Sequence, residues 1–312
     1  VKSNQYRSIM ALPIFIKSEQ IGCMVLLQEV SEAFNKEMAE IIRTFVSQAS
    51  ISLENAKLLG EAIENERYKE QLNIAKSVQK SLLPEKLKSN EYFEIAGYSM
   101  AADEVGGDYY DLIPYQNDRY GLIIGDVSGK GTSAAFNMAQ MKGVFYSLAQ
   151  MALSPKEFIS KANLALSNCL EKSSFITASY FDVQAKTGDV SFVRAGHCPT
   201  LVYCQSENQC KYLSTKGMGL GLLRNESYDQ FIFENSMNLA SGDIIVLYTD
   251  GITEASNPDG KQFGESGLQH SFLKHVHKPP TEISEGIIED LFTFLGDKKL
   301  DDDYTLVILK RK

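Results

Sequence analysis

The sequence has no long apolar run, no paired cysteine motif and no excess of basic residues. No segment approaches the roughly 18 apolar residues of a membrane span, and no charged-then-apolar signal peptide opens the chain. Its five cysteines are odd in number and show no CxxC spacing, which predicts free thiols in a reducing compartment. A net charge of −9 argues against nucleic-acid binding, which needs clustered Lys and Arg. These absences predict a cytoplasmic protein that neither spans a membrane nor binds nucleic acid.

Acidic residues at the ends of predicted strands are the most informative feature that is present. The motifs EVGGDYYD (104–111) and GDVSGKG (125–131) adjoin apolar strands, Asp250 follows the apolar segment 243–249, and DDDYT (301–305) opens the last strand. A single Asp beside Gly is more often a turn residue. Four such sites in order instead predict one shared cation site, because a buried carboxylate needs a charge partner. Oxygen ligands without Cys or His favour Mg²⁺ or Mn²⁺.

The N-terminal part predicts a β-hairpin of strands 8–16 and 21–27, followed by a helix that starts near residue 36. The segments SIMALPIFIKSEQIGCMVL and EIIRTFVSQASISLENAKLL resemble the C-terminal part of a GAF domain. The resemblance implies a partial sensor domain at 1–57, to which we assign no ligand. Because the sequence begins at Val1 without Met, we expect it to be a fragment of a longer protein.

The helix is expected to continue without a break to Leu83, and residues 58–88 are assigned as a helical linker. A stripe with spacings of three and four residues runs along it: Leu58, Ala62, Asn65, Tyr68, Leu72, Ala75, Gln79 and Leu82. This spacing predicts the seam of a coiled-coil homodimer. The alternative is a single amphipathic helix packed on its own domain.

Residues 89–312 predict an antiparallel α+β domain, because runs of strands are interrupted by paired helices. Strands are expected near 92–99, 109–114, 119–125, 175–183, 189–195, 200–204, 229–235, 243–249 and 304–311, and helices at 131–151, 155–170, 265–277 and 281–295. Thr132 and Ser133 are the expected N-cap of the first of these helices. Tyr109 and Tyr110 alternate across a strand, so we expect one in the core and one at the cleft.

Five motifs in order, EVGGDYYD, GDVSGKG, AGHCP, YTDGITEA and DDDYTLVIL, resemble the PPM-type metal-dependent serine/threonine phosphatases of the SpoIIE/RsbU branch. The resemblance covers about residues 80–312, and AKSVQKSLLPE before it fits that branch's linker. It implies a sandwich of two antiparallel sheets flanked by helices, with two Mn²⁺ or Mg²⁺ ions at one end. A two-metal centre activates a water for in-line attack at phosphorus.

The same resemblance assigns the site residues. The metal ligands are Asp108, Asp126, the carbonyl of Val127, Asp250 and Asp302, of which Asp108 and Asp126 are also the catalytic pair. The expected substrate-binding residues are Gly107, Gly129 and Lys130, although a solvated turn is the more frequent setting for such a lysine. Glu104, Asp111 and Asp303 are expected to orient the ligands. His197 is expected to be a structural, hydrogen-bonded group, and His270, His275 and His277 to lie on the surface.

The implied function is hydrolysis of phosphoserine or phosphothreonine on a partner protein, an anti-sigma-factor antagonist of the STAS type by resemblance to RsbU-like proteins. The alternative is a non-catalytic pseudophosphatase that binds a phosphoprotein. Its support is that residues 100–107 contain no Arg or Lys to hold phosphate and that Val127-Ser128 replace the His of eukaryotic relatives, whereas the presence of all four metal carboxylates argues against it. A phosphodiesterase or nucleotidase would need a base-binding pocket, which the sequence does not reveal.

Overall fold

The structure is a computed structural model that describes residues 5–312, so the first four residues of the predicted N-terminal domain lie outside it. The chain divides into two compact units, residues 1–71 and 72–312. The division falls inside the predicted linker, within one continuous helix, α1 (Lys36–Leu82). None of the described helices is both long and apolar enough to cross a membrane.

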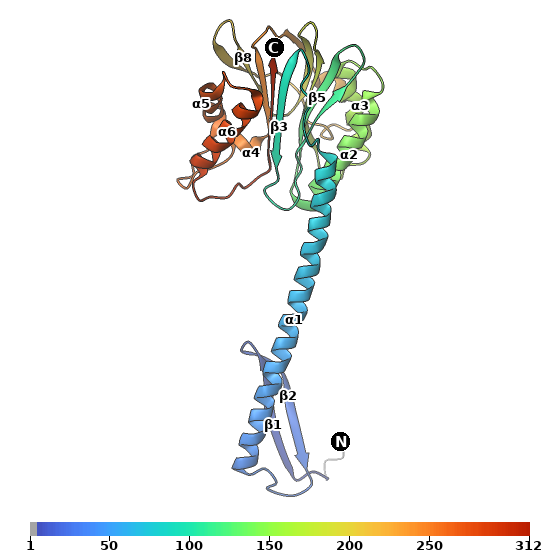
Figure 1. Ribbon diagram of the computed structural model, residues 1–312. Coiled ribbons are helices and arrows are strands. Elements are labelled where there is room, and N and C mark those ends of the chain that lie inside the picture. Colours follow the sequence, from blue (N-terminus) through green and yellow to red (C-terminus); the bar gives the residue numbers. More distant parts are fainter. Residues whose placement is uncertain (1–4) are drawn as a thin grey trace. The chain divides into compact units, whose positions relative to one another are not determined.

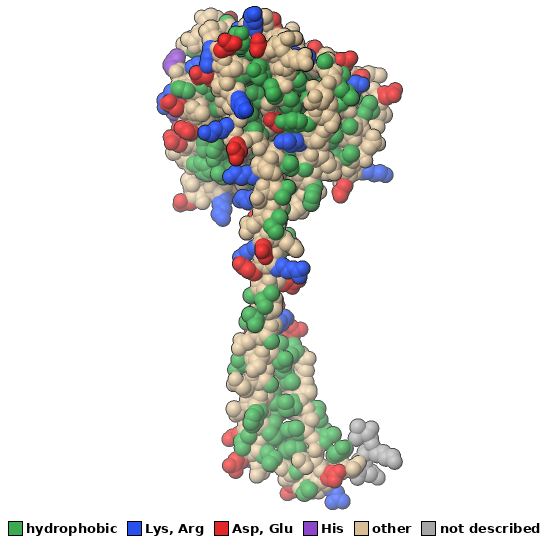
Figure 2. All heavy atoms as spheres, turned by 45° about the vertical axis from the view of Figure 1, so that its right-hand side comes forward, with side chains coloured by type: hydrophobic (Ala, Val, Ile, Leu, Met, Phe, Trp, Pro, Cys, Tyr) green, Lys and Arg blue, Asp and Glu red, His purple; other side chains and the backbone are tan. Residues whose placement is uncertain are grey.

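The first unit is an antiparallel hairpin, β1 (Ser8–Ile16) and β2 (Glu19–Gln28), together with the first part of α1. Its strands and the start of its helix agree with the sequence prediction. Of the residues described in this unit, Val46 is the one fully buried hydrophobic side chain. Hydrophobic side chains such as Phe45, which is 69% exposed, gather over the hairpin and the first half of α1 (Figure 2). The hairpin and the helix therefore leave apolar surface uncovered.

The second unit is a sandwich of two antiparallel five-stranded sheets with helices on both outer faces (Figure 1). One sheet has the order β10 (Glu234–Asn238), β7 (Asp189–Ala195), β6 (Ile176–Gln184), β5 (Arg119–Val127), β4 (Tyr109–Pro114); the other has the order β3 (Phe93–Met100), β12 (Tyr304–Arg311), β11 (Ile244–Tyr248), β8 (Thr200–Cys204), β9 (Gln209–Leu213). Helices α2 (Gly131–Ala149) and α3 (Pro155–Ser167) cover the first sheet, while α4 (Asp250–Thr253), α5 (Gly264–His275) and α6 (Pro280–Leu295) lie against the second. The predicted α+β sandwich is confirmed.

Three hydrophobic layers hold the sandwich together, because both faces of each sheet are covered. One lies between α2–α3 and the first sheet, one between the sheets, and one between the second sheet and α4–α6. Tyr109 is fully buried in the first layer and Tyr110 in the layer between the sheets. The prediction that one of these tyrosines lines a cleft is therefore wrong.

Most predicted elements are present, and the differences are local. The strand expected at 229–235 is instead a 3₁₀ helix, η1 (Glu226–Phe231), followed by β10, which begins at Glu234. Asn225 caps η1 through its side chain, which accepts a hydrogen bond from the Ser227 amide, and Tyr228 is buried. The elements β9 and α4 are not among those predicted from the sequence. The predicted cap of α2 is wrong, since Lys130 is the N-cap residue and makes no side-chain cap.

Candidate active site

Two acids from the first sheet lie beside each other because of the strand register. Asp108 directly precedes β4, and Asp126 lies near the end of β5. The register pairs Tyr109 of β4 with Gly125 of β5. The start of β4 therefore meets the end of β5, and the two carboxylates belong to one edge of the sheet.

The second sheet repeats this arrangement at the same end of the sandwich. Asp250 follows β11 and Asp302 precedes β12, and the register pairs Tyr248 with Leu306. Hydrogen bonds connect the two sheets here: Thr249 and Thr305 donate their hydroxyl protons to Asp108 Oδ2 over 2.8 and 2.7 Å. The four predicted ligands are thus brought to one region by two strand pairs and a cross-sheet contact.

Sequence reasoning missed both threonines. A signal was present, because Thr249 directly precedes one predicted ligand and Thr305 lies three residues after another. Hydroxyl groups beside acids at strand ends are suited to hold a carboxylate that points between two sheets.

Three acids of the site have raised pKa values, because they are buried close to one another without a positive charge beside them. Burial, and then the charge of Asp126, raise the pKa of Asp108, although the two threonine hydrogen bonds oppose this. Burial raises the pKa of Asp126 to about 7, with further contributions from the charges of Asp250 and Asp302. Burial also raises the pKa of Asp250. A bound cation would favour the ionised form of all three side chains.

The donor set suits a hard divalent cation. Asp108 Oδ1 is buried and has no hydrogen-bond partner, so this oxygen is free to bind a metal. Asp126, Asp250, Asp302 and the Val127 carbonyl would add oxygen ligands of the type that Mn²⁺ and Mg²⁺ prefer. Within residues 5–312, however, no three acidic, His or Cys side chains converge closely enough to hold an ion as they stand.

Asp303 holds the loop in front of Asp108. It accepts hydrogen bonds from the amides of Ala102 and Gly107 over 2.9 and 2.6 Å. A Cβ at Gly106 would lie 2.2 Å from Asp303 Oδ2, so only glycine allows this close approach. Asp303 therefore fixes the backbone of this loop, while its role in orienting the metal ligands stays a prediction.

The linker helix reaches the same loop through Gln79. Its side-chain amide donates to the Gly106 carbonyl over 2.5 Å, and its oxygen accepts from the Gly106 amide over 3.0 Å. From its spacing in the sequence, Gln79 is predicted to lie in a coiled-coil seam. In the structure the last four stripe residues, Leu72, Ala75, Gln79 and Leu82, are partly buried within the second unit, whereas the first four are exposed. The C-terminal half of the stripe therefore packs on its own domain.

Of the three predicted substrate-binding residues, Gly107 and Lys130 are occupied by contacts within the protein and Gly129 is exposed. The Gly107 amide is occupied by Asp303, so it does not point to substrate. Lys130 forms an ion pair with Asp302 over 3.1 Å and donates to the Asp301 carbonyl, so it is not a free turn lysine. Gly129 lies in the exposed turn before α2 with a φ of +98°, a conformation that glycine adopts readily.

The remaining predicted groups divide between site and scaffold. Glu104 is exposed at the edge of the site. Asp111 accepts a hydrogen bond from Tyr109 and lies 3.7 Å from Lys142, so it pairs with the scaffold and not with the predicted ligands. His197 is buried and hydrogen-bonded to Thr177 over 2.9 Å, as expected for a structural group.

The other histidines separate into two settings. His270 and His277 are exposed, in agreement with the prediction. His275 is partly buried near Asp290, with an N–O distance of 3.8 Å, so the expectation of a surface position is wrong for this residue.

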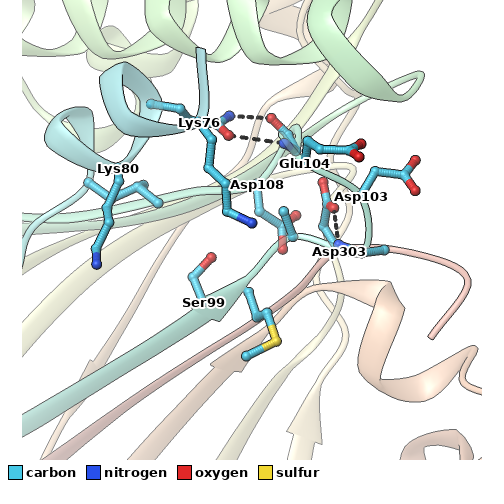
Figure 3. A pocket seen from close by; sticks show the side chains of 13 residues that line it. Lys76, Lys80, Ser99, Asp103, Glu104, Asp108 and Asp303 are labelled. Atoms are coloured by element: carbon cyan, nitrogen blue, oxygen red, sulfur yellow. Dashed lines mark hydrogen bonds between the residues drawn. The ribbon is translucent and has the colours of Figure 1, made fainter. Parts of the chain in front are cut away.

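A pocket of about 480 Å³ opens beside Asp108 (Figure 3). The side chains of Lys76, Gln79 and Lys80 from α1 form one wall. The rest is formed by Ser99 and Met100 at the end of β3, by residues 101–104 and Gly106 of the following loop, and by Asp108 and Asp303. The linker helix thus borders the site directly.

Comparison with solved structures identifies the class of fold. The chain aligns with the SiaA-PP2C domain of Pseudomonas aeruginosa with a TM-score of 0.70 and 20% identity, covering 80% of this chain and 99% of that one. It also aligns with the catalytic domain of the serine/threonine protein phosphatase PstP in complex with two manganese ions, with a TM-score of 0.51 and 12% identity, covering 71% of this chain and 99% of that one. The sandwich is a PP2C-type phosphatase fold.

Sequence comparison gives the family. The family model for stage II sporulation protein E matches residues 116–312. Phosphoserine phosphatase RsbU of Bacillus subtilis is 31% identical over 247 residues, which is 79% of this chain and 72% of RsbU. The chain therefore belongs to the SpoIIE family, and its second unit contains a PP2C-type serine/threonine phosphatase domain.

Proposed function

We propose that this protein hydrolyses phosphoserine or phosphothreonine on a partner protein by metal-dependent attack of water. The observation that carries the proposal is the meeting of two acid pairs, Asp108 with Asp126 and Asp250 with Asp302, at one end of the sandwich. The name of the relative RsbU, a phosphoserine phosphatase, supports the choice of substrate. Without a membrane-spanning helix among its described residues, the protein is proposed to act in the cytoplasm.

Two Mn²⁺ or Mg²⁺ ions, held by Asp108, Asp126, Asp250, Asp302 and the Val127 carbonyl, would supply an activated water and offset the charge of the phosphate. Thr249 and Thr305 orient Asp108 and favour its ionised form by donating to its Oδ2. Asp303 fixes the loop that carries Asp108. A preorganised carboxylate loses little entropy when an ion binds.

Regulation is proposed to act through α1. Gln79 on this helix makes two hydrogen bonds with Gly106, two residues before Asp108. A shift or rotation of α1 would therefore pull on the loop that positions a ligand. This contact supports the idea that the state of the N-terminal unit reaches the metal site along the helix.

The partner is proposed to be a phosphorylated anti-sigma-factor antagonist of the STAS type, because RsbU-like proteins resemble this chain. Homodimerisation is proposed through the exposed N-terminal half of the linker stripe, which includes Leu58 and Tyr68. Leu58→Glu combined with Tyr68→Glu should shift sedimentation equilibrium toward the monomer, whereas Glu64→Gln on the same helix should not.

A second candidate is a pseudophosphatase that binds phosphoproteins without cleaving them. The observation that supports it is the ion pair between Lys130 and Asp302, which occupies a predicted metal ligand. In that case the site would bind phosphoserine but release no phosphate.

The test compares a phosphoserine protein or peptide, a phosphotyrosine peptide and a nucleoside monophosphate in Mn²⁺. We expect phosphate release from the phosphoserine substrate and little from the nucleotide. Binding without release would favour the pseudophosphatase, and a preference for the nucleotide would contradict the proposed substrate class.

A further inference from the structure

The protein cations expected to hold a phosphate group beside the metal ions are absent or occupied. A phosphoserine carries a charge of about −1.5 to −2 at neutral pH. The loop from Met100 to Gly107 contains no Lys or Arg. Lys130, the cation that the sequence analysis singled out, is bound to Asp302 and the Asp301 carbonyl.

Lys76 is placed to fill this role. It is exposed on α1 and lines the pocket beside Asp108, whose volume of about 480 Å³ can receive a phosphoserine side chain. No carboxylate among residues 5–312 lies within 4.0 Å of its ammonium group. Figure 3 shows the side chain extending into the pocket toward Asp108, whereas Lys80, one turn further on, points elsewhere.

We propose that Lys76 of the linker helix binds the phosphate of the substrate and so takes the place of a phosphate-holding cation in the domain itself. This rests on the proposed function. The acids Asp103, Glu104 and Asp303 also line the pocket, so phosphate enters only when divalent ions offset their charge. Lys76 lies one turn before Gln79, so the helix that holds the loop also supplies the substrate contact.

Through Lys76, the linker helix would take a direct part in substrate binding. A movement of α1 would withdraw the cation from the pocket and weaken substrate binding. Control through Gln79 would instead change the geometry of Asp108. The two effects separate in kinetics, since the first changes KM and the second changes kcat.

The experiment uses the full chain in Mn²⁺ and compares wild type, Lys76→Gln, Lys76→Arg and Lys80→Gln. The first readout is the KM and kcat for p-nitrophenyl phosphate, and the second is the affinity for inorganic phosphate measured by calorimetry. An ammonium–phosphate contact at an exposed position predicts that Lys76→Gln raises KM and the phosphate Kd about threefold to fivefold, with kcat nearly unchanged. Lys76→Arg should restore both values, and Lys80→Gln should change them less.

Equal effects of Lys76→Gln and Lys80→Gln would overturn the proposal. They would show that phosphate responds to the summed positive charge of the helix and not to a direct contact with Lys76. An unchanged phosphate affinity in Lys76→Gln would overturn it as well. Tighter Mn²⁺ binding without a change in phosphate affinity would identify the pocket as a cation site instead. If wild type binds phosphate but releases none from any substrate, the proposed function fails while the role of Lys76 is still decided by calorimetry.

Discussion

The hydroxyl of Thr305 lies 2.7 Å from Asp108 Oδ2 and donates a hydrogen bond to it across the two sheets. Thr305 belongs to β12 of one sheet and Asp108 directly precedes β4 of the other, so this bond joins the two sheets. The other oxygen of Asp108 is left buried and without a partner. One contact thus connects the two halves of the sandwich and presents a free carboxylate oxygen.

Replacement of Thr305 by Val should weaken metal binding. The substitution keeps the shape but removes a hydrogen bond to an ionised group, which contributes about 1.5–3 kcal/mol. We therefore expect the Mn²⁺ dissociation constant, measured by calorimetry, to rise about tenfold or more. Thr293→Val on the exposed face of α6 is the matched control. Equal metal affinity in the Thr305 and Thr293 variants would contradict this role.

The raised pKa of Asp126 should make the stability of the metal-free protein depend on pH. Its folded-state pKa of about 7 lies above the ordinary value of 3.8, so the folded state binds more protons between these values. The free energy of unfolding should therefore fall as pH rises from about 4 to about 7. Asp126→Asn should reduce this decline in thermal unfolding scans with EDTA and should raise stability near neutral pH. A pH profile identical to that of wild type would contradict the raised pKa.

Gln79 should matter for activity although it lies on the linker helix. Gln79→Ala removes two hydrogen bonds with Gly106 and should lower kcat, by about thirtyfold if each contributes near 1 kcal/mol. Gln71→Ala, an exposed position on the same helix, should leave kcat unchanged. Equal kcat values in the two variants would show that the helix does not act through this contact.

His197 should affect acid stability more than catalysis. Burial lowers its pKa to about 3, so the ring is neutral in the folded protein. The unfolded chain takes up a proton near pH 6.5, which means that stability is lost as pH falls from about 6.5 toward 3. His197→Gln should make urea unfolding less sensitive to acid. A loss of activity of about 100-fold or more in a folded variant would instead indicate general acid–base catalysis.

The acids of the site could be predicted because their identity and their place at strand ends are local features. Asp108, Asp126, Asp250 and Asp302 each adjoin an apolar strand, and the antiparallel register then brings them to one end. Local patterns of apolar residues likewise predicted the hairpin of the first unit and four helices of the second unit. The GAF-like origin of the N-terminal unit stays a prediction, since no comparison addresses it.

The contacts that depend on distant segments could not be predicted in this way. The partner of Gln79 is the backbone of Gly106, which no side-chain pattern reveals. Lys130 was placed near phosphate by its motif, but Asp302 lies within reach and takes the charge. Tyr110 is buried because the second sheet covers it, and strand alternation alone cannot show which faces will be covered.

The most direct measurement is hydrolysis of p-nitrophenyl phosphate by wild type and Asp126→Asn with Mn²⁺, with Mg²⁺ and with EDTA, together with calorimetric titration of Mn²⁺. A metal site built on these acids predicts turnover by wild type with a divalent ion, none with EDTA, and a loss of about 100-fold or more in the variant. Turnover that persists in EDTA, or a folded wild type that binds no Mn²⁺, would contradict a metal-dependent phosphatase built on these four acids.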